Sequence, residues 1–226
     1  MKPLIIIPAR EGSKGVLKIN IKLLGGKPLI EYTLIAAREV FDDEIICVST
    51  DSLEIKKVVE GLGLNVPFLR PKELAEDTSS TYDVLLHALD FYKTNGYNPN
   101  VVILLQVTSP FRTGEQIREA LALYKDSYDM VVSVKETSSN PYYVLFEEYK
   151  DGWLRKSKEG NFVRRQDCPK VWEFNGAIYI INSKSLKNSQ LYEFKKIKKY
   201  VMNEEKSLDI DSALDWKIAE AIIESN

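Results

Sequence analysis

Three short runs of aliphatic and β-branched residues, separated by segments with helical periodicity, constrain the fold of this chain more than any other feature. The runs are LIII at 4–7, EIICV at 44–48 and VVILL at 101–105. Their apolar residues are continuous rather than alternating, which is typical of strands that are buried on both faces of a parallel sheet. We therefore expect a central, mostly parallel sheet.

Helical patterns occupy the intervals between these runs. Apolar residues recur at helical spacing over 28–41, 53–62 and 81–92. The spacings from Ser80 to Asp83 and from Thr113 to Gln116 are those of capping boxes, so we expect helices to begin there. Strand and helix alternate through about the first 134 residues, which predicts an α/β fold with right-handed crossovers and flanking helices.

Residues 138–172 interrupt this alternation and are interpreted as a small inserted arm. Aromatic residues are mixed with charges here, and Lys150-Asp151-Gly152 predicts a hairpin turn. The sheet pattern resumes at 177–181, and a last helix is expected after Asp211. We expect one domain over residues 1–226.

The composition excludes several classes of protein. The 226 residues include 31 Lys or Arg and 33 Asp or Glu, so no broad basic surface for nucleic acid is expected. Cys47, Cys168 and His87 are too few for a cysteine–histidine zinc site, and two distant cysteines suit a reducing compartment. No apolar run approaches the ~20 residues of a membrane span. We expect a cytoplasmic protein without nucleic-acid or membrane partners, and no catalytic role for His87.

Polar turns follow the expected strands, at the edge where doubly wound sheets bind ligands. The loop from Arg10 to Lys14 combines cations with glycines and suits a phosphate, although a solvated turn is an equal alternative. Its spacing fits neither the Walker nor the dinucleotide motif. Residues 49–52 are assigned to helix capping. Residues 106–112 follow a buried strand directly, which favours a ligand role.

Two further segments carry candidate ligand groups. Arg70 and the hydroxyls that precede the helix at 81 suit an anion or a base edge, with a surface loop as an equal alternative. Asp209-Ile210-Asp211, if extended, places both carboxylates on one side, which suits Mg²⁺. From spacing alone, Asp211 as a helix cap is the better interpretation.

Together, seven segments in order resemble the acylneuraminate cytidylyltransferases, also called CMP-sialic acid synthetases. The resemblance is carried by IPAREGSKG, NIKLLGGKPLI, STDS, RPKELAEDTSS, LLQVTSPFRT, RRQD with NGAIYI, and LDIDSALDW. It implies a Rossmann-like sheet and a homodimer that forms through 138–172. It also implies transfer of CMP from CTP to the anomeric 2-hydroxyl of a nine-carbon 2-keto-3-deoxy sugar acid, with Mg²⁺ as cofactor and release of pyrophosphate. Pseudaminic, legionaminic and ketodeoxyoctonic acids are alternative acceptors.

The resemblance also implies roles for individual residues. Arg10, Lys14, Lys18 and Asp211 would be catalytic, and Asp209 with Asp211 would hold Mg²⁺. The nucleotide would be bound by Arg10, Ser13, Lys14, Asn20, Arg70, Ser79, Ser80 and Thr81. The sugar acid would be bound by Gln106, Thr108, Ser109, Arg165, Gln166 and Asn175.

One position departs from the family pattern. The family usually has a lysine immediately before the residue that is Asn20 here, whereas this chain has Ile19 with Lys18 one position earlier. We expect the Lys18 amine to serve in its place, because a lysine ammonium has no strict orientation. The alternatives are a catalytically impaired nucleotide-binding homologue and an accidental substitution.

Overall fold

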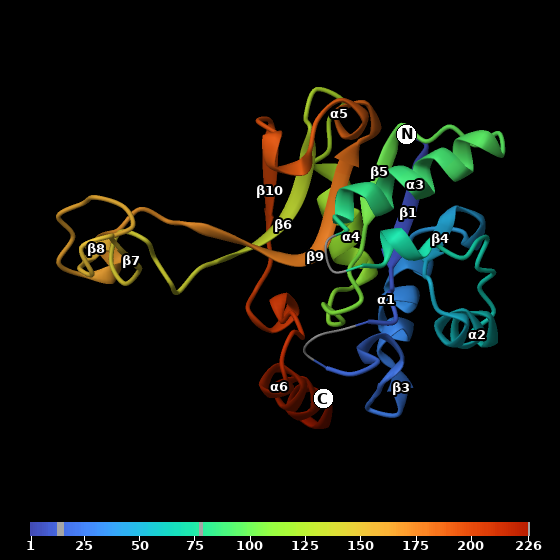
Figure 1. The fold of residues 1–226 in the computed structure, drawn as a ribbon, viewed down its shortest axis with the longest axis horizontal. Helices are drawn as coiled ribbons and strands as arrows, with labels where there is room; N and C mark the ends of the chain where they lie inside the picture. Colours follow the sequence, from blue (N-terminus) through green and yellow to red (C-terminus); the bar gives the residue numbers. More distant parts are fainter. Residues whose placement is uncertain (13–15, 77–78, 226) are drawn as a thin grey trace.

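The computed structural model describes residues 1–12, 16–76 and 79–225 and contains a six-stranded central sheet (Figure 1). The strand order is β10-β6-β9-β5-β1-β4. The strands are β1 (Pro3–Pro8), β4 (Ile46–Ser49), β5 (Val101–Leu104), β6 (Met130–Glu136), β9 (Trp172–Asn182) and β10 (Ile197–Val201). Two short strands, β2 (Leu23–Leu24) and β3 (Lys27–Pro28), form a separate ribbon.

The sheet is mostly parallel, which confirms the predicted α/β fold. β1 pairs in parallel with β4 and with β5, and β10 pairs in parallel with β6. β9 alone among these six strands runs antiparallel to both of its neighbours, β5 and β6. The carboxyl ends of β1, β4 and β5 therefore lie at one edge of the sheet.

The expected helices are present with small shifts at their ends. They are α1 (Leu29–Arg38), α2 (Leu53–Gly61), α3 (Thr81–Thr94), α4 (Gly114–Ala122) and α6 (Ala213–Ser225). The structure adds a short helix that the sequence analysis did not predict, α5 (Ser183–Asn188). Thr113 and Gln116 form a complete capping box, and Ser80 accepts a hydrogen bond from the Asp83 backbone N–H, so both predicted starts are confirmed. Within the described residues, no helix is both long enough and apolar enough to cross a membrane.

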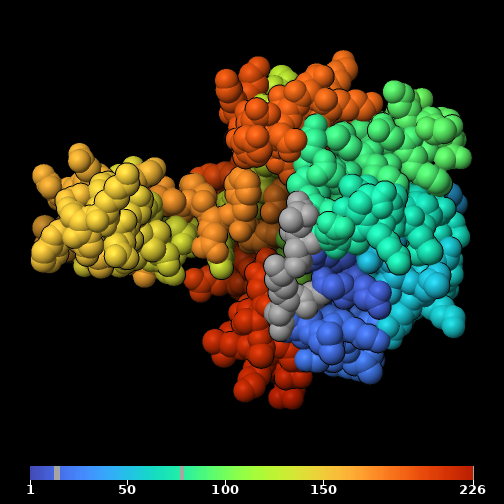
Figure 2. Space-filling model, in the orientation of Figure 1, coloured from blue at the N-terminus to red at the C-terminus, as the bar shows by residue number. Residues whose placement is uncertain are grey.

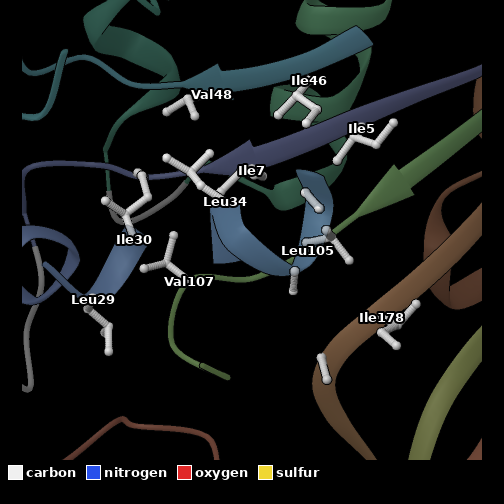
Figure 3. Close-up of a cluster of buried hydrophobic side chains, with 14 of the residues drawn as sticks. Ile5, Ile7, Leu29, Ile30, Leu34, Ile46, Val48, Leu105, Val107 and Ile178 are labelled. Atoms are coloured by element: carbon white, nitrogen blue, oxygen red, sulfur yellow. The ribbon is translucent and has the colours of Figure 1, made fainter. Parts of the chain in front are cut away.

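Alternate residues of β1 enter two different apolar clusters, one on each face of the sheet. Ile5 and Ile7 pack with Leu29, Ile30 and Leu34 of α1 (Figure 3). Leu4 and Ile6 belong to the opposite cluster, which includes side chains of α3 and α5. Burying each aliphatic side chain of this kind contributes ~1.5–3 kcal/mol, so helices on both faces stabilise the central strand.

The inserted arm projects away from the sheet between β6 and β9 (Figures 1 and 2). Its hairpin pairs β7 (Phe146–Glu148) with β8 (Leu154–Lys156), which confirms the turn expected at 150–152. The arm exposes large apolar side chains, including Trp153 at 71% and Val163 at 86%. The lysine-rich segment 195–199 overlaps β10, the edge strand, where three of the five strand residues are apolar or aromatic and two are lysines.

We predict that His87, on α3, makes the protein less stable below about pH 6.5. Burial lowers the pKa of His87 below 6.5, and the charge of Arg70 lowers it further, whereas Asp90 acts in the opposite direction. The unfolded chain therefore binds a proton before the folded chain does, and stability falls as the pH drops below the unfolded pKa. Urea unfolding at pH 7.5 and 5.5 should show this loss, and His87→Leu should reduce it. Equal losses in both proteins would contradict the prediction.

Candidate active site

A cavity of about 420 Å³ opens at the carboxyl ends of β1 and β5, where doubly wound sheets bind their ligands. We call it the cleft. Its lining comes from the loop after β1, the segment before α3, the turn after β5 and the extended segment before α6. The lining residues are Pro8, Arg10, Gly12, Ile19, Asn20, Arg70, Leu74, Glu76, Ser79, Thr81, Val84, Gln106, Val107, Thr108, Asp209 and Asp211.

The loop after β1 brings Arg10 and Asn20 to the cleft. The Asn20 side chain is 7% exposed and donates a hydrogen bond from Nδ2 to the Arg10 carbonyl oxygen at 2.8 Å. Arg10 donates from Nη1 to the carbonyl oxygen of Ala75 at 3.4 Å, which connects the loop to the opposite wall. Two other predicted residues of this loop, Ser13 and Lys14, lie outside the described residues.

Lys18 does not line the cleft, contrary to our expectation that its amine replaces the usual lysine. Lys18 has a left-handed backbone, with φ of 51°, and its Nζ lies 2.5 Å from Oε2 of Glu54 on α2. Ile19 begins the 3₁₀ helix η1 (Ile19–Ile21), is 4% exposed and packs in the core beneath the cleft. The one-residue offset therefore separates the two side chains, with the apolar one at the cleft wall and the charged one outside.

Arg70 is a buried cation at the cleft wall. Its residue is 4% exposed, and its Nη2 lies 3.6 Å from Oδ1 of Asp51. Burial lowers the pKa of Arg70, Asp51 raises it, and the charge of Arg10 lowers it again. Sequence reasoning treated Asp51 only as part of a helix-capping turn. Its place in the turn that follows a buried strand was the signal that could have identified it.

The hydroxyls before and at the start of α3 differ in their positions. Ser79 and Thr81 line the cleft, and Ser79 Oγ donates to the Glu73 carbonyl oxygen at 2.5 Å. Ser80 does not line it, because its side chain caps α3 and donates to Asp83 Oδ2 at 2.6 Å. The structure therefore assigns Ser80 a capping position rather than the predicted place beside a nucleotide.

The turn after β5 places Gln106 and Thr108 in the cleft lining. Ser109 is fully buried beneath it and donates to the Asn175 carbonyl oxygen at 3.1 Å. Arg112 ends the segment 106–112 that was predicted to have a ligand role, although no individual role was assigned to it. It is also buried; it donates to Thr33 Oγ1 at 2.8 Å and to the Gln106 carbonyl oxygen. Arg112 thus ties the backbone at Gln106 to α1.

Asp209-Ile210-Asp211 is extended, as the metal interpretation requires. Ile210 is fully buried and donates from its backbone N to the Thr108 carbonyl oxygen at 2.8 Å, while both aspartates line the cleft. Asp211 is not needed as a helix cap, because Ser212 and Asp215 bond one another across the first turn of α6. The capping alternative is therefore wrong.

The two carboxylates fit a hard cation. Burial raises the pKa of Asp209, and the neighbouring Asp211 carboxylate raises it too, whereas Thr108, Ser109 and Arg112 lower it. A divalent ion would relieve this repulsion, and Mg²⁺ is commonly bound by one or two carboxylates together with substrate phosphates. Among the described residues, no group of three or more His, Cys, Asp or Glu could hold a metal without such help.

Asn175 lies beside the cleft but does not line it, because its side-chain amide is fully engaged. Its Oδ1 accepts from Ser133 Oγ at 2.6 Å, and its Nδ2 donates to Ser207 Oγ at 2.8 Å. The residue is 2% exposed. The predicted contact between Asn175 and a sugar acid therefore has no support in this arrangement, and the side chain instead joins β9 to β6 and to the segment before Asp209.

Arg165 and Gln166 lie in the arm, in the exposed 3₁₀ helix η4 (Arg165–Asp167). They do not belong to the lining formed by their own chain. Arg164, the alternative to Arg165 for binding a carboxylate, forms an ion pair with Asp167 at 2.8 Å.

The sequence is similar to those of known proteins. The family described as "Cytidylyltransferase" matches residues 4–222. The chain is 36% identical to the CMP-N,N'-diacetyllegionaminic acid synthase of Legionella pneumophila, over 100% of this chain and 98% of that protein. It is 37% identical to the N-acylneuraminate cytidylyltransferase of Streptococcus agalactiae, over 96% of this chain but only 52% of that longer protein.

Solved structures share the fold. A CMP:2-keto-3-deoxy-manno-octonic acid synthetase complexed with CTP superposes with a TM-score of 0.73, at 16% identity and over 100% of this chain and 99% of that chain. The likeness confirms the Rossmann-like architecture expected from the sequence.

Gly176 provides a test of how tightly the base of the cleft is packed. Its φ is +73°, and a Cβ there would lie 2.4 Å from Gln106 Oε1 and 2.9 Å from Ser109 Oγ. Gly96 has a similar φ of +86°, but a Cβ there meets nothing within 4 Å. We predict that Gly96→Ala costs only the ~1–2 kcal/mol of a left-handed backbone.

Gly176→Ala should cost a further ~1–3 kcal/mol, because the neighbouring polar side chains must move. Urea unfolding of the two variants measures the difference. Equal losses of stability in the two variants would contradict the prediction, because they would show that the side chains around Gly176 can move without lowering the free energy of unfolding.

Proposed function

The chain belongs to the cytidylyltransferase family, and on that basis we propose that it transfers CMP from CTP to a nine-carbon 2-keto-3-deoxy sugar acid of the sialic acid type. Pyrophosphate is the second product. The acceptor's anomeric 2-hydroxyl loses its proton to solvent as its oxygen attacks the α-phosphorus. A P–O bond forms there, and the bond from the α-phosphorus to the oxygen that bridges to the β-phosphate breaks. The observation that carries the proposal is the cleft, which combines two arginines with an aligned carboxylate pair.

Different residues of the cleft would bind the nucleotide and the acceptor. Arg10 and Arg70 offer guanidinium groups to the nucleotide, and Asn20, Ser79 and Thr81 offer polar contacts near them. Phosphoryl-type transfer depends on such positioning and charge neutralisation more than on covalent catalysis. Gln106 and Thr108 lie on the side of Asp209 and would face the acceptor.

Asp209 and Asp211 would hold Mg²⁺. When bound, the ion supplies positive charge to the phosphate oxygens. The two carboxylates orient it from a rigid segment, because Ile210 between them is anchored in the core by packing and by its backbone hydrogen bond to Thr108.

The two relatives described above, a CMP-N,N'-diacetyllegionaminic acid synthase and an N-acylneuraminate cytidylyltransferase, favour two acceptors, N,N'-diacetyllegionaminic acid and an N-acylneuraminic acid. Pyrophosphate release should be measured with CTP, Mg²⁺ and a panel of both acids together with pseudaminic and ketodeoxyoctonic acids. The other nucleoside triphosphates serve as controls. CTP binding without release on any acid would instead support the impaired homologue suggested by Ile19.

Asp211→Asn should reduce turnover by roughly 10²-fold or more, the scale of losing one group that stabilises charge in the transition state. Asp215→Asn is the matched control. Asp215 is absent from the cleft lining, and the amide oxygen of an asparagine can still accept from the backbone N–H groups of Asp211 and Ser212. The assay is pyrophosphate release over a range of Mg²⁺ concentrations. A fully active Asp211→Asn enzyme, or full activity in excess chelator, would remove the metal assignment.

Lys18→Ala should change turnover by less than about threefold, because an exposed ion pair outside the site contributes little. Arg10→Ala, which removes a cation from the lining, should reduce turnover by roughly 10²-fold. Steady-state pyrophosphate release compares the two. A Lys18→Ala enzyme as impaired as Arg10→Ala would restore the lysine to the catalytic role that the sequence suggested.

We further propose that the protein is a cytoplasmic homodimer that forms through the arm at 138–172. The arm displays apolar side chains that its own chain does not cover, and such residues are enriched in interfaces. In a dimer, Arg165 and Gln166 could reach the sugar-acid side of the partner's cleft. A guanidinium there would pair with the acceptor's carboxylate.

Trp153→Glu should weaken this dimer by at least about tenfold, because a buried tryptophan commonly contributes 2 kcal/mol or more to an interface. Tyr192→Glu is the matched control, since Tyr192 is 85% exposed but lies outside the arm. Sedimentation equilibrium measures both. A monomeric native protein at micromolar concentration, or equal dimerisation of all three proteins, would exclude the arm as the interface.

A further inference from the structure

Asp51 connects three segments that meet at one wall of the cleft. It lies two residues after the end of β4, and its Oδ1 accepts a hydrogen bond from the backbone N of Glu11 at 3.1 Å. The same oxygen lies 3.6 Å from Nη2 of Arg70. One carboxylate oxygen therefore contacts both the loop that follows β1 and the buried guanidinium.

The backbone of Arg70 is hydrogen-bonded to Thr50, the residue that precedes Asp51. Arg70 donates from its backbone N to the Thr50 carbonyl oxygen at 2.7 Å, and Thr50 forms a parallel bridge with Leu69. The main chain of Arg70 is thus fixed beside the end of β4. Its side chain is still long enough to take several rotamers, so the backbone contacts alone do not fix the guanidinium.

The guanidinium needs a counter-ion where it lies. The Arg70 side chain is 3% exposed and the Asp51 side chain 16% exposed, and Nε and Nη2 of Arg70 are buried without a hydrogen-bond partner among the described residues. A buried cation that loses its counter-ion is strongly unfavourable. The positive charge of Arg10 also disfavours the charged form of Arg70, and it lowers the pKa of Arg70.

We propose that Asp51 is a positioning residue, whose carboxylate holds the Arg70 guanidinium in the cleft wall and the start of the β1 loop beside it. The nucleotide then meets both arginines without having to order them. The inference rests on the proposed function for its effect on CTP, but the positioning itself is a property of the free protein.

Asp51→Asn is the decisive variant, because it keeps an oxygen for the Glu11 N–H and removes the charge. It should raise KM for CTP about tenfold or more, the typical effect of losing a hydrogen-bonded charge, and change kcat and KM for the acid less than threefold. Ser52→Ala is the matched control. Ser52 is the N-cap residue of α2 and is adjacent to Asp51. Its replacement by alanine removes the capping hydrogen bond and lowers the stability of the protein, but it leaves the Asp51–Arg70 pair intact.

His87 gives a second readout that needs no catalysis. It is the chain's single histidine, and the charge of Arg70 helps to lower its pKa. NMR titration should show a higher His87 pKa in Asp51→Asn, as Arg70 leaves the wall, and no change in Ser52→Ala. Arg70→Ala sets the size of the full effect.

The results separate the two hypotheses. An Asp51→Asn protein with an unchanged or lowered His87 pKa would overturn the positioning role, as would an unchanged KM for CTP in an active enzyme. If the native protein releases no pyrophosphate, the proposed function fails. The His87 titration then decides alone whether Asp51 holds Arg70.

Discussion

The parallel pairing of β4, β1 and β5 is the constraint on which the rest of the structure depends. Ile5, at the centre of β1, is in register with Ile46 on one side and Ile103 on the other. β1 and β4 end level, with Pro8 opposite Ser49, and β5 ends two residues earlier, opposite Ile6. Residues that follow β1 and β5 therefore line a common space. The cleft is a consequence of strand register, which apolar burial on both faces enforces.

A second long-range contact completes the site. The Ile210 backbone N bonds to the Thr108 carbonyl oxygen, which fastens a segment near the end of the chain to the turn after β5. Gly176 allows the polar side chains of these segments to approach one another, because it has no Cβ. A Cβ there would lie within 3.1 Å of Gln106 Oε1, Ser109 Oγ and Asp209 Oδ2. Segments separated by about a hundred residues thereby share one layer of polar atoms.

Much of the fold could be predicted because its signals are local. The apolar runs, the capping residues at Ser80 and Thr113 and the hairpin turn at 150–152 each act within a few residues. The antiparallel direction of β9 could not be read, since an apolar run has no direction. The sequence also could not predict that the Lys18 side chain lies outside the cleft while Ile19 lines it. This arrangement follows from the left-handed backbone conformation of Lys18. The motif that suggested Asn175 could not show that its side-chain amide is already hydrogen-bonded to Ser133 and Ser207, so its predicted contact with a sugar acid stays a prediction.

The charges of the cleft argue for a metal independently of any resemblance. Its described lining has two cations, Arg10 and Arg70, and three carboxylates, Glu76, Asp209 and Asp211. Arg70 is already paired with Asp51 behind the wall. A triphosphate that entered such a surface alone would meet more repulsion from the carboxylates than attraction from the arginines. The divalent ion proposed for Asp209 and Asp211 would reverse that balance, because it would add positive charge to the acidic side of the cleft.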